Sequence, residues 1–518
     1  MNLKGLNFTT FDDSITVYFK KSKSISDKFY YLYYINNKVV EKGYKTHYTF
    51  NNLTSQTKYE IKVEIYVKNK LVKTYLGTGT TKPTPNVIDV TKSPYNAVGD
   101  GVTLNTQAIQ KAIDDCKKGE RVYIPKGTFL TGALNLHSDM ELYVEKGAIL
   151  QGTTNEFDYL PKVNSRFEGY EMKCYRSLIN IGTMTREKVY NCKNVVLRGG
   201  GTISGGSYVL AQNITLREKE ELTEYIKSLG EKVKTFDSID AIPGRARGRL
   251  ICVANTNGVI LSDLRLENGP AWTNHFIYSK NIVTQNCYIY SRPIHNGDGW
   301  NPDSSENCVI FGTGFETGDN CVAIKSGKNP EGNIINRPTI GVYIFDCVIN
   351  SGGGFAIGSE MSGGVKDVYM WDVDATGGLL GVRIKAPTVR GGYIKNVEVL
   401  DSKLCDISIT TKYFCNLDGD SAKTPTTFED FYFENVYLTG ISHFYYNMHS
   451  ANGDMNKVLI TEPKSRPIIS IVGPNDDDNE IKNVTIKNCT ILKRKIKDSQ
   501  IIELDNIKNL QFTNVNFK

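Results

Sequence analysis

A short repeated motif constrains the fold of this 518-residue chain more than any other feature. In each copy, Asn, Gly or Asp precedes an apolar, alternating run, and copies begin at Asn194, Asn257, Asn281, Asn307, Gly341, Asp367, Asn396, Asn483 and Asn509. The clearest intervals are 24 residues (257 to 281) and 26 residues (281 to 307, 341 to 367 and 483 to 509). A period of about 20 to 30 residues with short strands is typical of a solenoid. Because the units show no helical periodicity, the repeat predicts a parallel β-helix.

The recurrent asparagines suit the turns between stacked coils. Asparagine tolerates the left-handed conformation, and its side-chain amides can form ladders along a stack. A solenoid also needs capped ends. Residues 104–116 carry apolar side chains at helical spacing and predict an amphipathic helix over the N-terminal end. A second helical stretch, 218–229, interrupts the repeat, and we expect it to project from one face and wall a binding groove.

The first 82 residues predict a separate domain. Four short alternating runs, separated by turn residues, indicate a small β-sandwich, and they lie at 14–19, 30–35, 59–65 and 71–75. The stretch 53–63 resembles the tyrosine-corner region of fibronectin type III domains, although Ser55 stands where proline is usual. A stiff linker, 81–85, follows. We therefore expect a fibronectin type III-like sandwich at 1–82 and an all-β helix at 83–518.

Composition and charge limit the kinds of molecule that the protein is expected to bind. The net charge of +6 fits an anionic substrate, but lysine and arginine are dispersed, which does not favour nucleic acid. No apolar run approaches the roughly 20 residues that span a bilayer, so no membrane is expected. The start shows no apolar signal segment, which predicts a cytoplasmic protein, with secretion after removal of a leader as the alternative. The 11 cysteines are scattered and predict buried thiols, and no cluster indicates a metal or cofactor.

One face of the predicted helix collects acids, an amide and cations. Asp298 and Asp319 are 21 residues apart, so they should be neighbours on successive coils about 4.8 Å apart. Asn320 follows directly, and Arg383 and Lys385 share one side of a later strand. Two acids and two cations can bind an acidic sugar and protonate its leaving oxygen. The alternative is that Asp and Asn merely fill polar turns of the solenoid.

These residues carry a resemblance to a known family. The segments 296–299, 318–327 and 383–385 resemble the polygalacturonases, family 28 of the glycoside hydrolases, as do 122–132, 270–275 and 357–364. The likeness spans about 86–410 in the family's order. It implies a right-handed parallel β-helix that hydrolyses α-1,4-linked galacturonate of pectin with inversion. Bacterial members with a fibronectin-like N-terminal domain are often exo-acting, which fits the inserted segment 207–247.

The resemblance also assigns roles. Asp319 matches the general acid, Asp298 matches one carboxylate that activates water, and Arg383 and Lys385 match the pair that holds a substrate carboxylate. Asn320 stands where the family has a third Asp, and an amide cannot accept a proton from water.

The family's Gly-His-Gly falls on residues 351–353, so Gly352 replaces its His. The chain is then an inactivated variant, a branch with altered chemistry, or a weak or dead hydrolase. Stacking would also bring the two acids closer than the roughly 6.5–9.5 Å expected of inverting enzymes.

Four further residues are candidates for the same site. His295 and His275 would each line sugar subsites, with a packed or solvent-facing histidine as the alternative in either case. Lys325 follows Asp319 at period two and should share its face. Glu360 is a spare carboxylate near Gly352 and could supply what Asn320 and Gly352 lack.

Three other functions stay open beside an exo-polygalacturonase. The first is a non-catalytic oligogalacturonate-binding protein, which Asn320 and Gly352 favour. The second is a hydrolase of the rhamnogalacturonan backbone. The third is a pectate lyase, which needs clustered acids for calcium and an arginine base. The expected partner is an oligo- or polygalacturonate of pectin, and the oligomeric state is not indicated.

Overall fold

The computed structural model describes residues 3, 5–23, 29–236, 241–292, 294–414, 417–449, 455–463, 467–474, 479–492 and 501–518. It forms two compact units. The first is Met1–Val87 with Gly119–Arg121, and the second is Ile88–Lys118 with Val122–Lys518. Across the described residues, no helix is both long and apolar enough to cross a membrane.

The first unit holds two antiparallel sheets around one core. One sheet has the order β1 (Asn7–Thr10), β2 (Ile15–Tyr18), β5 (His47–Phe50), and the other β4 (Lys38–Gly43), β3 (Phe29–Ile35), β6 (Lys58–Val67), β7 (Lys70–Thr80). The four predicted strands are confirmed as β2, β3, β6 and β7. The Tyr59 hydroxyl accepts the Thr54 N–H at 2.9 Å, a contact of the kind expected in a tyrosine corner. The fibronectin likeness and the boundary at 82/83 stay predictions.

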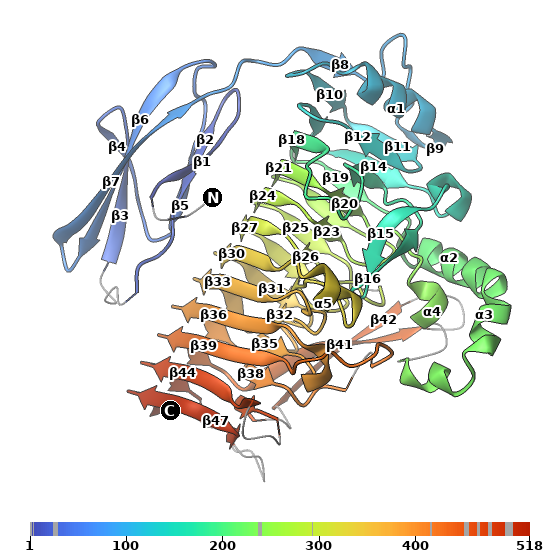
Figure 1. The fold of residues 1–518 in the computed structure, drawn as a ribbon. Helices are drawn as coiled ribbons and strands as arrows, with labels where there is room; N and C mark the ends of the chain where they lie inside the picture. The colour runs from blue at the N-terminus through green and yellow to red at the C-terminus, as the bar shows by residue number, and fades with distance from the viewer. Residues whose placement is uncertain are drawn as a thin grey trace. The chain divides into compact units, whose positions relative to one another are not determined.

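The second unit confirms the parallel β-helix. Its coils build two 13-stranded sheets and one 11-stranded sheet, in which strands of successive coils are neighbours (Figure 1). The first sheet runs from β8 (Val87–Asp89) to β47 (Ile507–Thr513), and the second from β9 (Asp100–Leu104) to β48 (Asn516–Phe517). Inward side chains from all three sheets form one apolar core. The ten described cysteines are all free thiols, and all but Cys252 are buried.

The turn asparagines form the expected ladders. Asn281 Nδ2 donates to Asn257 Oδ1 at 2.8 Å, and Asn307 Nδ2 donates to Asn281 Oδ1 at 3.3 Å. Asn281 and Asn307 have φ of 57° and 55°, in the left-handed region that asparagine tolerates. The repeated Asn is therefore a turn residue that also links one coil to the next.

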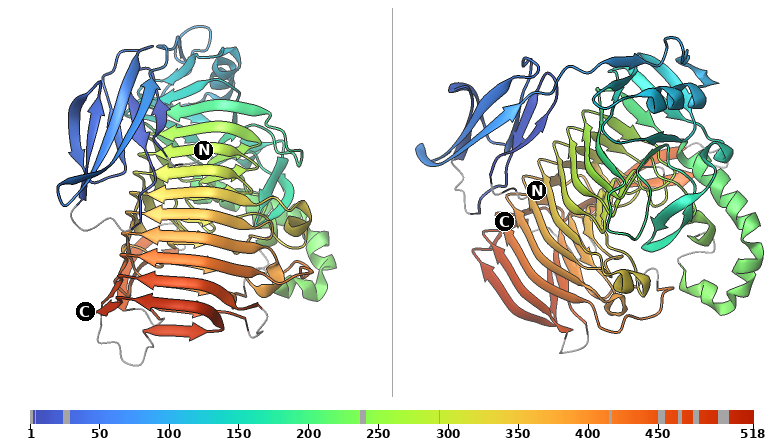
Figure 2. Two further views of the ribbon diagram at one scale, coloured as in Figure 1. Left: turned by 60° about the vertical axis from the view of Figure 1, so that its left-hand side comes forward. Right: turned by 45° about the horizontal axis from the view of Figure 1, so that its top comes forward.

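Helices cap and interrupt the solenoid. Helix α1 (Thr106–Asp115) buries Ile109, Ala112 and Ile113 and confirms the N-terminal cap. The inserted helices are α2 (Ser207–Glu221), α3 (Thr223–Ser228) and α4 (Ala241–Gly244), with a 3-10 turn, η2 (Gly230–Thr235), between α3 and α4. They lie beside the coils (Figure 2). This insertion begins earlier than the periodicity predicted, because the apolar side chains of α2 do not gather on one face.

Among the described residues, three long insertions enter directly before strands of the 11-stranded sheet. Its strands are β12 (Leu134–Leu136), β17 (Ile179–Ile181), β20 (Ile251–Ala254), β23 (Asn274–Ile277), β26 (Trp300–Asp303), β29 (Val322–Ile324), β32 (Phe355–Ile357), β35 (Val382–Lys385), β38 (Ile407–Thr410), β43 (Ile469–Val472) and β46 (Ile502–Asp505). The hairpin β15 (Val163–Phe167)–β16 (Tyr170–Cys174) precedes β17, and the inserted helices precede β20. The hairpin β41 (Ile441–His449)–β42 (Met455–Pro463) precedes β43. Loops therefore gather on this sheet, where the site forms.

Candidate active site

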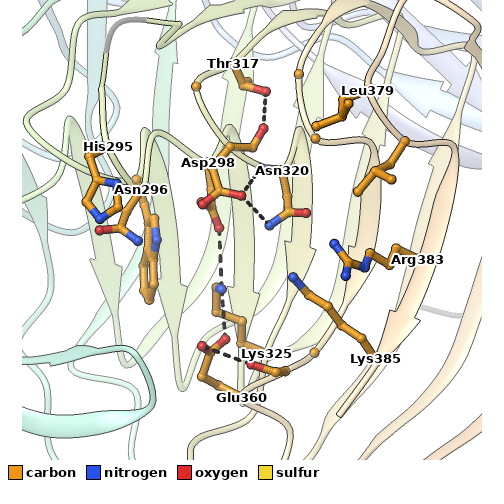
Figure 3. A pocket seen from close by; sticks show the side chains of 18 of the residues that line it. His295, Asn296, Asp298, Thr317, Asn320, Lys325, Glu360, Leu379, Arg383 and Lys385 are labelled. Atoms are coloured by element: carbon orange, nitrogen blue, oxygen red, sulfur yellow. Dashed lines mark hydrogen bonds and ion pairs between the residues drawn. The ribbon is translucent and has the colours of Figure 1, made fainter. Parts of the chain in front are cut away.

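A cavity of about 390 Å³ opens on the 11-stranded sheet. Its walls come mainly from the turns before β26, β29, β32 and β35 and from the segment after β32. They hold the predicted residues Asp298, Asp319, Asn320, Lys325, Glu360, Arg383, Lys385 and His295. Figure 3 shows seven of these eight side chains with labels. Residues predicted from positions spread over 90 residues of chain thus meet in one place.

Asp298 and Asp319 lie on neighbouring coils, as their spacing predicts. Trp300 of β26 pairs in parallel with Val322 of β29, and the Gly299 N–H donates to the Asn320 carbonyl at 3.0 Å. Asp298 is buried, whereas Asp319 is partly exposed to the cavity. The two carboxylates therefore have different surroundings, as an acid and a base in one site require.

Burial has the largest effect on the pKa of Asp298. It raises the pKa of this carboxyl to about 7, against the opposing effect of Lys325. The charges of Asp319 and Glu360 raise this pKa further, and Lys385 lowers it. Asp298 therefore exchanges a proton near neutral pH, which is the property of an effective general base.

Lys325 bridges two carboxylates in the wall of the cavity (Figure 3). Its Nζ lies 3.4 Å from Asp298 Oδ2 and donates to Glu360 Oε2 at 3.1 Å. Burial would raise the pKa of Glu360, but Lys325, followed by Arg390 and Lys385, holds it well below its usual range. Glu360 is therefore a fixed negative charge that anchors Lys325, and this arrangement does not make it a proton carrier.

Asn320 donates to Asp319 and so differs from a second acid. Its backbone N–H and its Nδ2 both donate to Asp319 Oδ1, at 2.8 Å and 2.9 Å. A carboxylate at position 320 would repel Asp319 at this distance, whereas the amide holds it in place. Asn320 can orient a water through its carbonyl oxygen, but it cannot take the proton of that water.

Gly352 occupies a backbone position that excludes a side chain. Its φ is +141°, and an added Cβ would lie 2.1 Å from Thr317 Oγ1 and 2.6 Å from Cys321 Sγ. Thr317 Oγ1 in turn donates to the Asp319 carbonyl at 2.7 Å. A side chain such as histidine therefore does not fit at position 352 unless the backbone moves.

Two cations face the cavity from β35 (Figure 3). Arg383 is partly exposed, and Lys385 is buried. Burial, together with the nearby Arg383, lowers the pKa of Lys385. Its Nζ donates to the Tyr413 hydroxyl at 3.4 Å, and both cations lie over the Tyr413 ring. The pair can bind a carboxylate, Arg383 through two parallel hydrogen bonds.

The two histidine predictions have different outcomes. His295 is exposed and lines the cavity. His275 is fully buried outside the cavity, with Nε2 3.2 Å from Asp303 Oδ2, so its prediction as a sugar contact is wrong. Burial lowers the pKa of His275 to about 4, and Asp303 opposes this effect. The reason is local: Arg166 from the β15–β16 hairpin covers this part of the sheet and donates to Asp303 at 2.7 Å.

Other residues that line the cavity were not predicted from the sequence. They include Glu168, Trp272, Arg292, Asn296, Tyr413 and His443. Trp272 and Asn296 lie inside segments that resemble the family, which is a signal that could have found them. The others lie outside those segments, so neither the repeat nor the resemblance marks them.

The structure offers no cluster of metal ligands. In the described part of the chain, no group of three or more His, Cys, Asp or Glu side chains could hold an ion.

Comparison with known proteins gives a consistent match. The family model described as glycosyl hydrolases family 28 matches residues 116–454. An exo-poly-alpha-D-galacturonosidase of Dickeya chrysanthemi is 30% identical over 387 residues, which cover 69% of this chain and 63% of that protein. The match thus spans less than two thirds of this relative's length.

Two solved structures share the fold. The family 28 exopolygalacturonase of Yersinia enterocolitica superposes with a TM-score of 0.77 at 22% identity, covering 100% of this chain and 98% of that one. The hyperthermoactive exopolygalacturonase of Thermotoga maritima gives 0.67 at 24% identity, covering 84% and 92%. At these identities the superpositions establish the architecture.

Proposed function

The chain belongs to family 28 of the glycosyl hydrolases, and from this premise we propose that it hydrolyses α-1,4-galacturonosidic bonds of pectin fragments from a chain end. One observation carries the proposal: a single cavity brings Asp298 and Asp319 beside Arg383 and Lys385. The acids supply proton transfer, and the cations supply the site for the sugar's carboxylate. The location in the cytoplasm stays a prediction.

The proposed reaction follows from the positions of the acids. Asp319 donates a proton to the glycosidic oxygen as that bond to the anomeric carbon breaks. A water oxygen bonds to the anomeric carbon from the opposite face, and Asp298 takes the proton that the water loses. The products are two shorter sugars, the configuration inverts, and one water is consumed.

Asp298 acts as the base without help from position 320. It is the buried carboxyl with a pKa of about 7, and it is held by Lys325. Asn320 orients the water and fixes Asp319, for which an amide suffices. Activity therefore requires Asp298 to be ionised and falls as the pH drops below about 7.

Attack at a chain end is supported by the insertions. Hairpin residue Glu168 lines the cavity, and Arg245, directly after α4, donates to Glu168 Oε2 at 2.7 Å. Insertions that enter before β17 and β20 thus contribute to one wall. Such a wall limits how much sugar chain extends in that direction.

A second candidate is a galacturonate-binding protein that does not cleave. Asn320 and the blocked position at Gly352 are the observations that favour it. Product analysis separates the two functions, with this chain and the Asn320→Asp variant incubated with trigalacturonate and polygalacturonate. Hydrolysis predicts release of mono- or digalacturonate by the unmodified chain, whereas tight binding without release by either protein supports the binding function.

A further inference from the structure

Glu168 lines the cavity from a segment far from the two acids in sequence. It lies at the tip of the β15–β16 hairpin, where Phe167 pairs with Tyr170, so Glu168 and Gly169 form a two-residue turn. Both turn residues have positive φ, 45° and 84°. The Glu168 side chain is only 7% exposed, and Glu168 is one of the residues that line the cavity.

The hairpin tip is fixed against the wall of the site. Phe167 stacks on Trp272, with ring centroids 5.0 Å apart, and Trp272 itself lines the cavity. The Lys328 N–H donates to the Gly169 carbonyl at 3.1 Å. A Cβ on Gly169 would lie 2.4 Å from Lys328 Cβ, so only glycine allows this approach. Glu168 is therefore held in one position.

A buried ion network supports the Glu168 carboxylate. Arg245 Nε donates to Glu168 Oε2 at 2.7 Å, and Arg245 Nη1 donates to Asp418 Oδ2 at 3.0 Å. Lys328 donates to the other oxygen of Asp418. In this network two cations face two acids, Glu168 and Asp418. Glu168 Oε1 is then available to accept hydrogen bonds from a ligand.

The direction of the substrate follows from the order of the coils. Trp272 precedes β23, Asp298 precedes β26, Asp319 precedes β29, and Arg383 lies on β35. Water activated by Asp298 attacks the sugar that keeps the anomeric carbon, and Asp319 protonates the leaving part. The retained sugar thus lies toward Trp272 and Glu168, and the leaving chain lies toward Arg383.

We propose that Glu168 recognises the free hydroxyl at C4 of the non-reducing terminal galacturonate. This inference rests on the proposed function. In an α-1,4 chain, only the non-reducing terminus carries a free C4 hydroxyl, because every interior C4 oxygen is glycosidic. A fixed carboxylate accepts a hydrogen bond from that hydroxyl and repels the carboxylate of a sugar turned the wrong way. Glu168 thereby selects chain ends.

The test compares two trigalacturonates that differ only at the non-reducing end. One carries the C4 hydroxyl, and the other is 4,5-unsaturated and lacks it. We expect the unmodified chain to prefer the saturated sugar in kcat/KM, and Glu168→Gln to lose about 10- to 100-fold on the saturated sugar while changing little on the unsaturated one. The matched control is Glu171→Gln, which breaks ion pairs on the same hairpin outside the cavity.

Two results would overturn the inference. One is an unmodified chain with no preference between the sugars, and the other is a Glu168→Gln variant that loses both activities equally, as a structural role predicts. If the unmodified chain cleaves neither sugar, the proposed function fails, and calorimetric affinities for the two sugars decide on Glu168. If Glu168→Gln binds the two sugars equally while Glu171→Gln still prefers the saturated one, the role of Glu168 is supported. If Glu168→Gln keeps the preference for the saturated sugar, that role is refuted.

Discussion

The two sides of the cavity differ in the charge of their side chains. On the first side, Asp298, Lys325 and Glu360 form a buried chain of ion pairs. On the second side, Asn320 is an uncharged amide that donates to Asp319, and Gly352 has no side chain. The difference indicates that the proposed base, Asp298, depends on buried ion pairs, whereas the proposed acid, Asp319, is positioned by an uncharged amide. The predictions below test that division.

The largest expected effect comes from the charged side. Asp298→Asn removes the base but keeps the shape, so kcat should fall by about 1,000-fold. Asn320→Ala removes only water orientation and one hydrogen bond, and the loss in kcat should be about 10-fold. Initial rates on trigalacturonate measure both. An equal loss of kcat in the two variants would mean that Asp298 and Asn320 contribute equally to catalysis, which would contradict the division between the two sides.

A smaller effect is expected at the blocked position. Gly352→Ala places a Cβ against Thr317 and Cys321, and it should lower the free energy of unfolding by about 1–3 kcal/mol more than a control. The control is Gly147→Ala, which also has positive φ, +89°, but meets only the Lys126 side chain at 3.8 Å or more. Thermal unfolding compares the two. A Gly352→Ala protein as stable as the control would mean that the backbone accommodates a side chain there.

The smallest effect concerns pH. Asp298 acts in its ionised form, so activity is lost as the pH falls through its pKa of about 7. Glu360 raises that pKa, so Glu360→Gln should move the acid limb of kcat/KM to lower pH. Values of kcat/KM measured between pH 4 and 9 locate the acid limb in both proteins. A shift to higher pH would show that Lys325 loses its position when Glu360 is neutral.

Much of the fold follows from the repeat. Intervals of 24 and 26 residues predict coils whose equivalent residues stack, and the Asn257–Asn281–Asn307 ladder is the direct result. Stacking also places Asp298 beside Asp319, and the period of two along β35 puts Arg383 and Lys385 on one side of that strand, so those four residues were predictable.

The features of the site that the sequence did not predict come from segments that interrupt the repeat. The β15–β16 hairpin buries His275 and brings Glu168 to the cavity, and no periodic signal places a hairpin tip against a coil about 100 residues later. The bridge from Lys325 to Glu360 also depends on the path of the chain after β32. Burial and three-dimensional charge neighbours, which set the pKa of Asp298, are not visible in sequence.

The most direct test of Asp298 as a sufficient base is product analysis with trigalacturonate at pH 8. The account predicts that the unmodified chain releases galacturonate or digalacturonate and that Asp298→Asn releases neither at a comparable rate. It would be contradicted if the unmodified chain were inert while Asn320→Asp cleaved, because a carboxylate at position 320 would then be indispensable.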